Sequence, residues 1–486
     1  RDHVVSSRTL KSMRLPDTVK WRDVSAGNIQ KVSSDIIIPN SIPFSMNLLF
    51  DRILGEAESR AGTNIVGAQL EGSQACLGLF QHLDSTVPNN KLFAGFNASI
   101  YDVIAGTISI GSLTAASKQD FMTFLNTTLM LNGTESRAYT AAGGWVTTGS
   151  VLDAGGVPSG GKFPIEFKDR VYAAVTDRLY YTNTPTGGNV SWGASGSGSL
   201  QVEQEDGGGI LQGLNKVPGY LLIYKQRSLK RWNFDSTFPE DLVNIGTQSN
   251  KSIVRARGKN YFFYGPNGFY ETSGGYPKLI SRPVQRMVES IASSFYASVN
   301  GWSDNDHVYW SIGDITVDFD RGFTETFNNV VLRYTIDTQQ WAPLQYAHEF
   351  RALTQYISGN DTLTIGGDTN GQVLQLNTGN SDYGSVAIKY LLQSPEFDFN
   401  NREYFKTVSE KIFVHSDRTI GALLQARLDY GEWKAIGSLK DIVTEVQISP
   451  LRARVFEFRV VDSISGEQVK LRGLDFPNVN VEESSK

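Results

Sequence analysis

Apolar and polar positions alternate over residues 329–344, on both sides of a short turn. Leu332 and Tyr334 fall on one face of an extended strand, because successive side chains of a strand point to opposite faces. Asp337 suits the first position of a turn, since its carboxylate can accept a hydrogen bond from the backbone two residues on. Trp341 then begins a return strand. The pattern predicts a β-hairpin, which needs neighbouring strands to bury its apolar face.

The same arrangement occurs seven times along the chain: an apolar strand, a short polar or glycine-bearing turn, and a strand that carries a large apolar anchor. The anchors, in order, are Tyr101, Tyr139, Tyr181, Trp232, Tyr270, Tyr334 and Leu376. Most steps between them are close to the roughly 40–50 residues of a four-stranded propeller blade. The sequence therefore predicts an all-β fold, with a β-propeller over 46–385 that has six or seven blades, seven being favoured. A strand that closes the ring could come from Ile65-Val66 or from the C-terminal end, and the pattern leaves both open.

One inserted helix is predicted between the fifth and sixth hairpins, where Pro283 suits a first helical turn. Its apolar residues have the spacing of a single helical stripe and are Val284, Met287, Val288, Ile291, Ala292 and Phe295. We expect this helix to cover the surface of the ring. The glycine-rich stretches 155–161 and 187–209 are expected to be surface loops.

The two ends of the chain depart from the repeat. Residues 1–45 are polar and contain three prolines, which favours an extended arm that packs on the main body or on a neighbouring molecule. Residues 386–478 alternate in the manner of antiparallel strands and are expected to form a C-terminal β-domain. Residues 479–486 are expected to be a flexible tail. A β-module appended to a propeller usually serves as an assembly surface.

The charge balance restricts the function. With 45 basic and 50 acidic residues, the net charge of −5 argues against a protein that holds nucleic acid through a general basic field. The chain has no apolar run long enough to cross a bilayer. Its single cysteine, Cys76, is expected to pack as a small apolar group, and the absence of any intramolecular disulfide favours synthesis in a reducing cytosol.

Two glycine-rich stretches resemble ligand loops without completing them. Residues 156–162 match the first seven positions of a phosphate-binding loop, but Phe163 stands where Ser or Thr must hold Mg²⁺, and Pro158 removes a backbone donor. Residues 366–371 resemble part of a calcium loop, yet the later acidic ligand is missing, so a hairpin turn at Asn370-Gly371 is expected. The five histidines, none of which is in a metal-ligand spacing, are His3, His82, His307, His348 and His415. No catalytic, cofactor-binding or metal-binding residue is predicted.

Two sets of charged residues could in principle form sites. Glycoside hydrolysis needs two converging carboxylates, and the acids that could reach a propeller mouth are Asp304, Asp306, Glu203, Glu205 and Asp206. Their spacing does not require convergence, and no Ser-x-Asp-x-Gly-x-x-x-Trp turn of the sialidase kind is present. The one compact basic cluster, interleaved with Tyr224 and Trp232 as a nucleic-acid patch can be, consists of Lys225, Arg227, Lys230 and Arg231. On a strand and its turn it is expected to be a solvated face.

A resemblance to a known family rests on the segment before the first blade. Its residues are Asn47, Phe50-Asp51, Gly55 and Arg60-Ala61-Gly62-Thr63. This lead-in motif, together with the irregular blade repeat and the inserted helix, resembles the tail hub or nozzle propeller proteins of short-tailed bacteriophages, which stabilise packaged DNA.

The resemblance implies a non-enzymatic structural protein of the virion, made in the bacterial host cytoplasm. It implies a homohexameric ring below the portal and adaptor proteins, in contact with tail needle, tip, fibre or spike proteins. Such a ring would continue the DNA channel, retain packaged double-stranded DNA and allow its ejection. Cations along that channel would hold phosphates and slow the DNA, so we expect a lumen without a continuous Lys/Arg stripe.

Two alternatives remain open from the sequence. An extracellular carbohydrate-binding or glycan-cleaving propeller would explain the six Asn-x-Ser/Thr triplets, although no signal segment is visible; they begin at Asn97, Asn126, Asn132, Asn189, Asn250 and Asn360. A protein-interaction propeller of the kelch or WD40 kind is the other alternative, but the regular signatures of those repeats do not recur.

Overall fold

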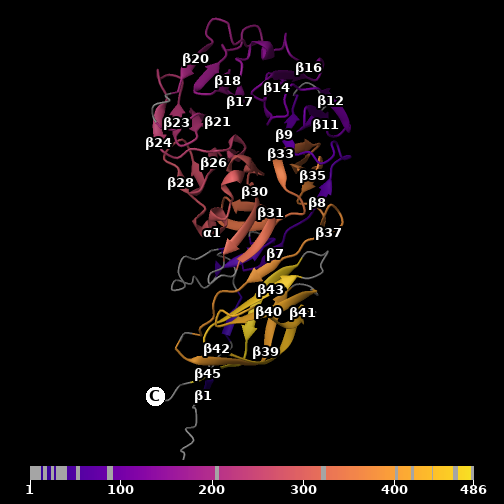
Figure 1. Cartoon of the computed structure of the whole chain (residues 1–486), viewed down its shortest axis with the longest axis vertical. Coiled ribbons are helices and arrows are strands. Elements are labelled where there is room, and N and C mark those ends of the chain that lie inside the picture. The colour runs from indigo at the N-terminus through magenta and orange to yellow at the C-terminus, as the bar shows by residue number, and fades with distance from the viewer. Residues whose placement is uncertain are drawn as a thin grey trace, which may run out of the picture.

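The structure is a computed structural model, and it describes residues 12–14, 19–22, 27–28, 41–50, 55–84, 91–202, 207–318, 324–399, 403–416, 421–439, 442–462 and 469–482. Within these residues the chain forms a ring of small β-sheets and, next to it, a two-sheet β-sandwich (Figure 1). The predicted all-β class is confirmed, and the ring is a seven-bladed β-propeller with one blade for each predicted hairpin.

Six blades are four-stranded antiparallel sheets built from consecutive strands. Blade 1 contains β9 (Cys76–His82), β10 (Lys91–Phe96), β11 (Ser99–Asp102) and β12 (Thr107–Gly111), and blade 2 contains β13 (Asp120–Phe124), β14 (Thr127–Leu131), β15 (Ser136–Thr140) and β16 (Gly144–Val146). Blade 3 contains β17 (Lys162–Phe167), β18 (Arg170–Val175), β19 (Arg178–Tyr181) and β20 (Gly198–Gln201), and blade 4 contains β21 (Leu211–Val217), β22 (Tyr220–Lys225), β23 (Leu229–Trp232) and β24 (Glu240–Val243). Blade 5 contains β25 (Val254–Ala256), β26 (Lys259–Tyr264), β27 (Gly268–Thr272) and β28 (Lys278–Leu279), and blade 6 contains β29 (Asn300–Ser303), β30 (His307–Asp318), β31 (Thr324–Thr335) and β32 (Gln340–Gln345).

The repeat found in the sequence corresponds to the same place in every blade. All seven anchors lie on the third strand of their blade, from Tyr101 on β11 to Tyr334 on β31 and Leu376 on β35 (Val373–Leu376). The second strands are buried along most of their length, because neighbouring blades cover both of their faces. First strands of neighbouring blades contact one another around the axis, whereas β12, β20, β24 and β28 lie at the periphery (Figure 1).

Blade 7 is closed by a strand from the other end of the ring. Its strands β33 (Phe350–Ser358), β34 (Asp361–Asp368) and β35 are followed by β8 (Thr63–Ile65), which pairs antiparallel with β35. Two further short strands, β36 (Ser381–Asp382) and β37 (Val386–Ala387), extend this sheet beyond β8. The sequence left two candidates for the strand that closes the ring, and the structure shows that it is the segment around Ile65.

The expected inserted helix is much shorter than its apolar stripe. The segment forms a 3₁₀ turn (Arg282–Val284), the α-helix α1 (Gln285–Glu289) and a second 3₁₀ segment, η4 (Ser293–Ser298). Ile291 instead forms a β-bridge with Ile315, and Ala292 is extended. Tertiary pairing with blade 6 therefore breaks the helix, although Val284 and Met287 remain fully buried. Two more 3₁₀ turns are η1 (Ala154–Gly156) and η2 (Asn250–Ser252).

The sandwich combines strands from both ends of the chain. One sheet contains β1 (Ser12–Arg14), β2 (Val19–Trp21), β6 (Leu48–Leu49), β7 (Ala57–Ser59), β39 (Phe405–Ser416), β42 (Val443–Ala453), β44 (Lys470–Phe476) and β45 (Val479–Glu482). The other contains β5 (Phe44–Met46), β38 (Leu391–Gln393), β40 (Ala422–Leu428), β41 (Lys434–Leu439) and β43 (Phe456–Asp462). A separate parallel pair is formed by β3 (Gly27–Asn28) and β4 (Ser41–Ile42).

This pairing changes two of the expected boundaries. Residues 46–59, assigned to the propeller from sequence, supply β6 and β7 to the sandwich, where β7 pairs with β44. The expected tail at 479–486 begins as β45, which pairs with both β39 and β1; residues 483–486 lie outside the described part. Periodicity could not reveal these pairings, because the terminal strands are short and their partners lie far away in sequence.

An aromatic cluster shared by blades 5 and 6 forms part of the propeller core. Trp310 is fully buried, and its ring centroid lies 4.4 Å from that of Phe269 and 5.8 Å from that of Trp341. Its indole Nε1 donates a hydrogen bond to the Ser252 carbonyl, so the one polar atom of the side chain is satisfied.

Replacing Trp310 by alanine should lower the free energy of unfolding by about 3–5 kcal/mol, because it opens a cavity in this cluster. The measurement is denaturant unfolding followed by circular dichroism. Ile104→Ala, at a side chain that is 53% exposed, is the control and should change stability by about 0.5 kcal/mol or less. Equal losses in the two variants would contradict the placement of the core.

Candidate functional site

The propeller and the sandwich meet at a buried polar cluster centred on Asn47 and Arg60. Asn47 has a positive φ of 61°, a conformation that asparagine tolerates better than most residues. Its Oδ1 accepts hydrogen bonds from Arg60 Nε at 2.9 Å and from the Gln345 backbone at 2.6 Å. Its Nδ2 donates to the Lys389 carbonyl at 2.7 Å. One side chain therefore joins blade 6 to the segment that leads into the sandwich.

Arg60 uses all five of its N–H donors in this cluster. Its guanidinium forms a two-pronged ion pair with Asp382, at 2.9 and 2.6 Å, and both side chains are almost fully buried. The remaining donors reach Asn47 and the Ala61 and Gln345 carbonyls. Its Cζ also lies 4.0 Å from the ring centre of Tyr346, a cation–π contact. Full satisfaction of the donors is what makes a buried charge pair tolerable.

Gly62 and Thr63 complete the connection where β8 enters blade 7. A Cβ on Gly62 would lie 2.0 Å from the Ser381 carbonyl oxygen, so only glycine allows this approach of two backbones. Thr63 Oγ1 accepts from the Tyr383 backbone at 3.2 Å. We call the set Asn47, Arg60, Gly62, Thr63 and Asp382 the clasp.

A second buried carboxylate lies next to the clasp. Asp368, fully buried at the β34–β35 turn, accepts backbone hydrogen bonds from Asn370 and Gln372, each at 2.8 Å, and one from the Tyr383 hydroxyl at 2.7 Å. Its other contact is His348 Nδ1 at 3.1 Å. Burial acts to raise the pKa of Asp368, but the hydrogen bonds from His348, Gln372, Tyr383 and Asn370 outweigh it and the pKa is lowered. Burial raises the pKa of the Tyr383 phenol, and its hydrogen bond to Asp368 raises that pKa further.

The clasp includes four of the eight residues that carried the family resemblance. Asn47, Arg60, Gly62 and Thr63 all belong to the lead-in motif, while Asp51 lies outside the described residues. Sequence reasoning missed Asp382 and Asp368, which come more than three hundred residues later. The only signal available for Asp382 was the need of a buried arginine for a carboxylate, and the sequence does not reveal that Arg60 is buried.

The two glycine-rich loops are structural, as expected. Residues 156–162 run from η1 into strand β17, and no helix follows. Residues 366–371 form the β34–β35 hairpin turn, with Gly371 at a φ of 75° and its Cβ position 1.2 Å from the Glu71 carbonyl oxygen. Cys76 is buried, and burial raises the pKa of its thiol to about 12, consistent with the predicted apolar role.

The two candidate glycosidase acids that the structure describes have different partners. Asp304 accepts from His307 Nδ1 and from the Tyr309 hydroxyl, each at 3.0 Å, whereas Asp306 pairs with Arg257 at 2.5 Å. The other three candidates, Glu203, Glu205 and Asp206, lie outside the described residues. Among the residues that are described, no group of three or more His, Cys, Asp or Glu side chains could hold a metal ion.

The basic cluster is only in part the expected solvated face, because Arg227 is exposed but two of its lysines are buried. Lys225 and Lys230 are 0% and 2% exposed, and Lys230 pairs with Asp241 at 2.5 Å. Arg231 pairs with Glu240 at 2.7 Å. The prediction failed because the strand that carries Lys230 lies inside blade 4 rather than at its edge.

The axis of the propeller is bridged by side chains from blades that are not neighbours. Lys251, which precedes blade 5, donates to the Gln119 carbonyl at 2.5 Å and pairs with Asp120 of blade 2 at 3.3 Å. Asn250 donates to the same carboxylate at 3.2 Å. Lys118 donates to the Ala297 carbonyl of η4, and η4 has no buried residue, so η4 lies on the surface of the ring near this end of the axis. The axial passage of a single propeller is therefore crossed by these contacts.

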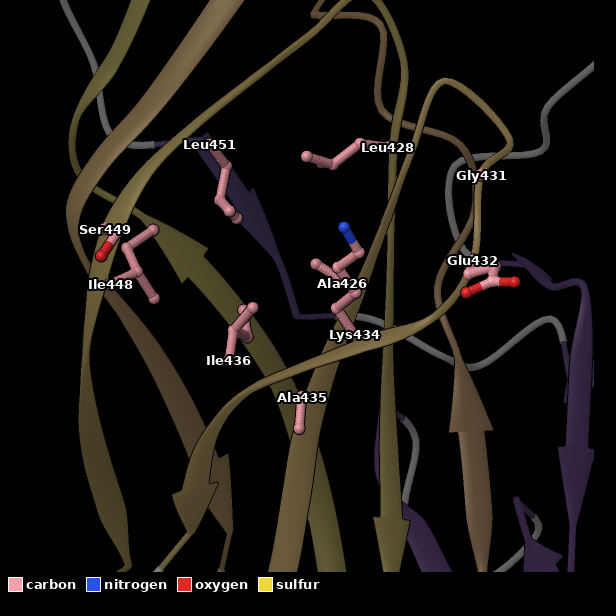
Figure 2. Close-up of a pocket in the computed structure, with 10 residues that line it drawn as sticks. All are labelled: Ala426, Leu428, Gly431, Glu432, Lys434, Ala435, Ile436, Ile448, Ser449 and Leu451. Carbon is pink, nitrogen blue, oxygen red and sulfur yellow. The ribbon is translucent and has the colours of Figure 1, made fainter.

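A pocket of about 360 Å³ lies in the sandwich, between β40, β41 and β42 (Figure 2). Its wall is largely aliphatic and includes Leu428, Ile436, Ile448 and Leu451, with Lys434 beside them. Its lining also includes one acid, Glu432, and one hydroxyl, that of Ser449, so it holds no pair of acids. The pocket is suited to an apolar side chain rather than to chemistry.

Comparisons with known proteins leave the family open, since no family model and no curated protein matches the chain. One similar structure, described as the extracellular domain of a hybrid two component system from B. thetaiotaomicron, is 10% identical with a TM-score of 0.42, over 65% of this chain and 39% of that one. A second, described as that of a one component system from the same organism, is 10% identical with a TM-score of 0.42, over 86% of this chain and 60% of that one. The chain thus spans less than two thirds of either structure.

No helix in the described part of the chain is long and apolar enough to span a membrane.

Arg60→Ala should lower the free energy of unfolding by about 3–5 kcal/mol, because it leaves Asp382 buried without its partner. Arg60→Lys keeps the positive charge but cannot form the two-pronged ion pair, so its stability should lie between that of the wild type and that of Arg60→Ala. Denaturant unfolding measures the loss. The control is Arg472→Ala, which breaks a pair whose arginine side chain is 52% exposed and should cost about 1 kcal/mol or less. A loss no larger than that of the control would contradict a buried clasp.

Asp368 should make the free energy of unfolding depend on pH in the acid range. Because its pKa is lower in the folded state, its contribution is complete above the ordinary aspartate value of about 4 and is lost as pH falls through the folded pKa. Asp368→Asn should therefore be less stable at pH 7 and lose less on going from pH 5 to pH 3. Thermal midpoints across this range measure the effect, with Asp361→Asn, at an exposed site, as the control. An unchanged acid slope in Asp368→Asn would show that the carboxylate is not held as described.

Proposed function

We propose that the chain is a structural virion protein that forms the tail hub or nozzle ring of a short-tailed phage. The observation that carries this proposal is the clasp: the motif that resembles the phage family supplies the residues that join propeller and sandwich into one unit. A ring component under the pressure of packaged DNA needs such a rigid connection between its two parts.

In this role the DNA channel runs between copies rather than through one propeller. The contacts of Lys251 and Asn250 with Asp120 cross the propeller axis, and a passage bridged by single side chains is far too narrow for duplex DNA. Six copies around a common axis would enclose a wider lumen. The net charge of −5 fits a lumen that lets phosphates slide, because few long-lived cation contacts would form.

The carbohydrate alternative is less well supported by the site geometry. Asp304 and Asp306 are each committed to other side chains. Asn132, one of the six candidate glycosylation sites, is 3% exposed, and its Oδ1 accepts from the backbone of Thr134 and Glu135. An attached glycan would have to displace this turn.

The purified chain should form a closed ring, with six copies expected, and should bind the portal–adaptor complex of its phage. Native mass spectrometry gives the copy number, and cryo-electron microscopy of the assembled tail shows the inner wall, which should lack a continuous Lys/Arg stripe. A glycan array and a glycan hydrolysis screen test the carbohydrate alternative. The proposal would be overturned by a chain that stays monomeric, does not bind the portal–adaptor complex and binds a defined sugar.

A further inference from the structure

His82 differs from the other histidines of the described chain in its surroundings. Each of the other three has an aspartate carboxylate within 3.1 Å of a ring nitrogen, and they are His307, His348 and His415. His82 has no carboxylate partner among the described residues, and its Nδ1 instead lies 2.8 Å from the hydroxyl of Thr128. Its Nε2 is buried and has no hydrogen-bond partner there.

The His82 ring lies where blade 1 packs against blade 2. His82 is the last residue of β9 and is 0% exposed. Thr128 belongs to β14 and is also fully buried, and the ring of Tyr139 on β15 meets the imidazole edge-on, with the two ring centres 4.8 Å apart. We call this contact between β9 and the strands β13, β14 and β15 the blade 1–2 seam.

The blade 1–2 seam depends on side-chain packing. No strand of blade 1 pairs with a strand of blade 2 in the described part of the chain. The rings of Phe80 and Phe121 stack across the seam with centres 5.5 Å apart, and those of Phe93 and Tyr139 are 4.8 Å apart. Because few polar contacts cross the seam, an unfavourable charge inside it has a large effect on how tightly the two blades hold together.

The charged groups next to His82 do not provide a partner for a second proton. Lys91 lies opposite His82 in the β9–β10 ladder, so their side chains are on the same face of blade 1. Lys91 pairs with Asp102 at 2.5 Å, so this carboxylate is already engaged. Tyr356 of blade 7 also lies within electrostatic range of Lys91. A protonated His82 would thus have a lysine, and not an acid, across the ladder.

Two further titratable groups face the seam. The negative charge of Asp84 acts to raise the pKa of His82, but burial outweighs it and the pKa is lowered. Burial raises the pKa of the Tyr139 phenol, so this side chain is uncharged at neutral pH and offers no negative charge. The closed seam therefore favours the neutral imidazole.

We infer that His82 is an acid-sensitive switch, whose protonation opens the blade 1–2 seam. The neutral ring fits the closed seam with its one hydrogen bond to Thr128. A protonated ring has N–H donors at both nitrogens and a positive charge, and the buried Nε2 has no acceptor beside it. Since an unpaired buried charge is costly, the proton is taken up when the blades separate and water reaches the ring.

The sign and size of the effect follow from linkage. In the open seam His82 returns to the ordinary histidine pKa of about 6.5. Because its pKa is lower in the closed seam, opening takes up a proton, so the stability of the seam is complete above about pH 6.5 and declines as pH falls toward the folded pKa. The population of the open seam should rise about tenfold between pH 7.5 and pH 5.5.

Hydrogen exchange measured by mass spectrometry on the full chain tests the switch, after correction for the intrinsic pH dependence of amide exchange. Peptides from β9, β13 and β14 should show the rise in opening in acid. Peptides from blades 4 and 5, which contain no histidine, are the internal control and should show a much smaller rise. This comparison within the wild-type chain requires no substitution.

Variants then assign the rise to His82. His82→Phe keeps an aromatic ring against Tyr139 but cannot be protonated, and it should abolish the acid response of blades 1 and 2. His82→Gln, which keeps a polar side chain without a titration in this range, should do the same. His415→Gln removes a titratable histidine from the sandwich and is the matched control, in which blades 1 and 2 should still respond. Circular dichroism checks that each variant keeps its fold.

Two results would overturn the inference: a wild-type chain whose β9 and β14 peptides open no more at pH 5.5 than at pH 7.5, or an equal acid response in the wild type and the His82 variants. Neither result bears on the proposed ring function, because the switch is measured within one propeller whatever the number of copies.

Discussion

The ion pair between Arg60 and Asp382 is the interaction on which the arrangement of the two parts depends. Both side chains are buried, and a buried charge pair is stable only when its remaining donors and acceptors form hydrogen bonds. Here Asn47 and the Gln345 carbonyl satisfy the arginine, while Thr63 and the Ala347 backbone donate to the carboxylate. The pair therefore specifies one relative position of blade 6, blade 7 and the sandwich, since any other would leave charges unpaired.

The path of the chain explains why this junction matters. The chain passes through the sandwich as β5, β6 and β7, closes the propeller as β8, completes the ring, and returns to the sandwich as β38. Closing the ring and building the sandwich thus use neighbouring residues, so neither can form fully without the other. A propeller closed in this way resists opening between its first and last blades, which is the weak point of any circular array of sheets.

The contacts across the propeller axis place a second constraint on function. Lys251 and Asp120 bring blades 5 and 2 together, so side chains cross the centre of the ring. The proposed phage role therefore requires a DNA channel between copies and not along the axis of one propeller.

Much of the fold could be predicted because it is encoded locally. The spacing from Tyr101 to Leu376 favoured seven blades over six, since each hairpin carries its own turn and its own apolar anchor within a few residues. Local pattern also excluded the phosphate loop, because Phe163 and Pro158 are neighbours of the motif. The helix at 284–295 shows the limit of such reasoning: its stripe is buried as expected, but pairing of Ile291 with Ile315 overrides the helical preference.

The sequence by itself determined the all-β class, favoured seven blades over six, and indicated a β-domain at the C-terminal end. Only the tertiary structure decided which strand closes the ring, which N-terminal strands complete the sandwich, and that Lys225 and Lys230 are buried. The physical reason is the range of the interactions. Alternation and turn chemistry act over a few residues, whereas the partners of Arg60, β8 and β45 are brought together from distant parts of the chain by backbone pairing and by the need to neutralise buried charge.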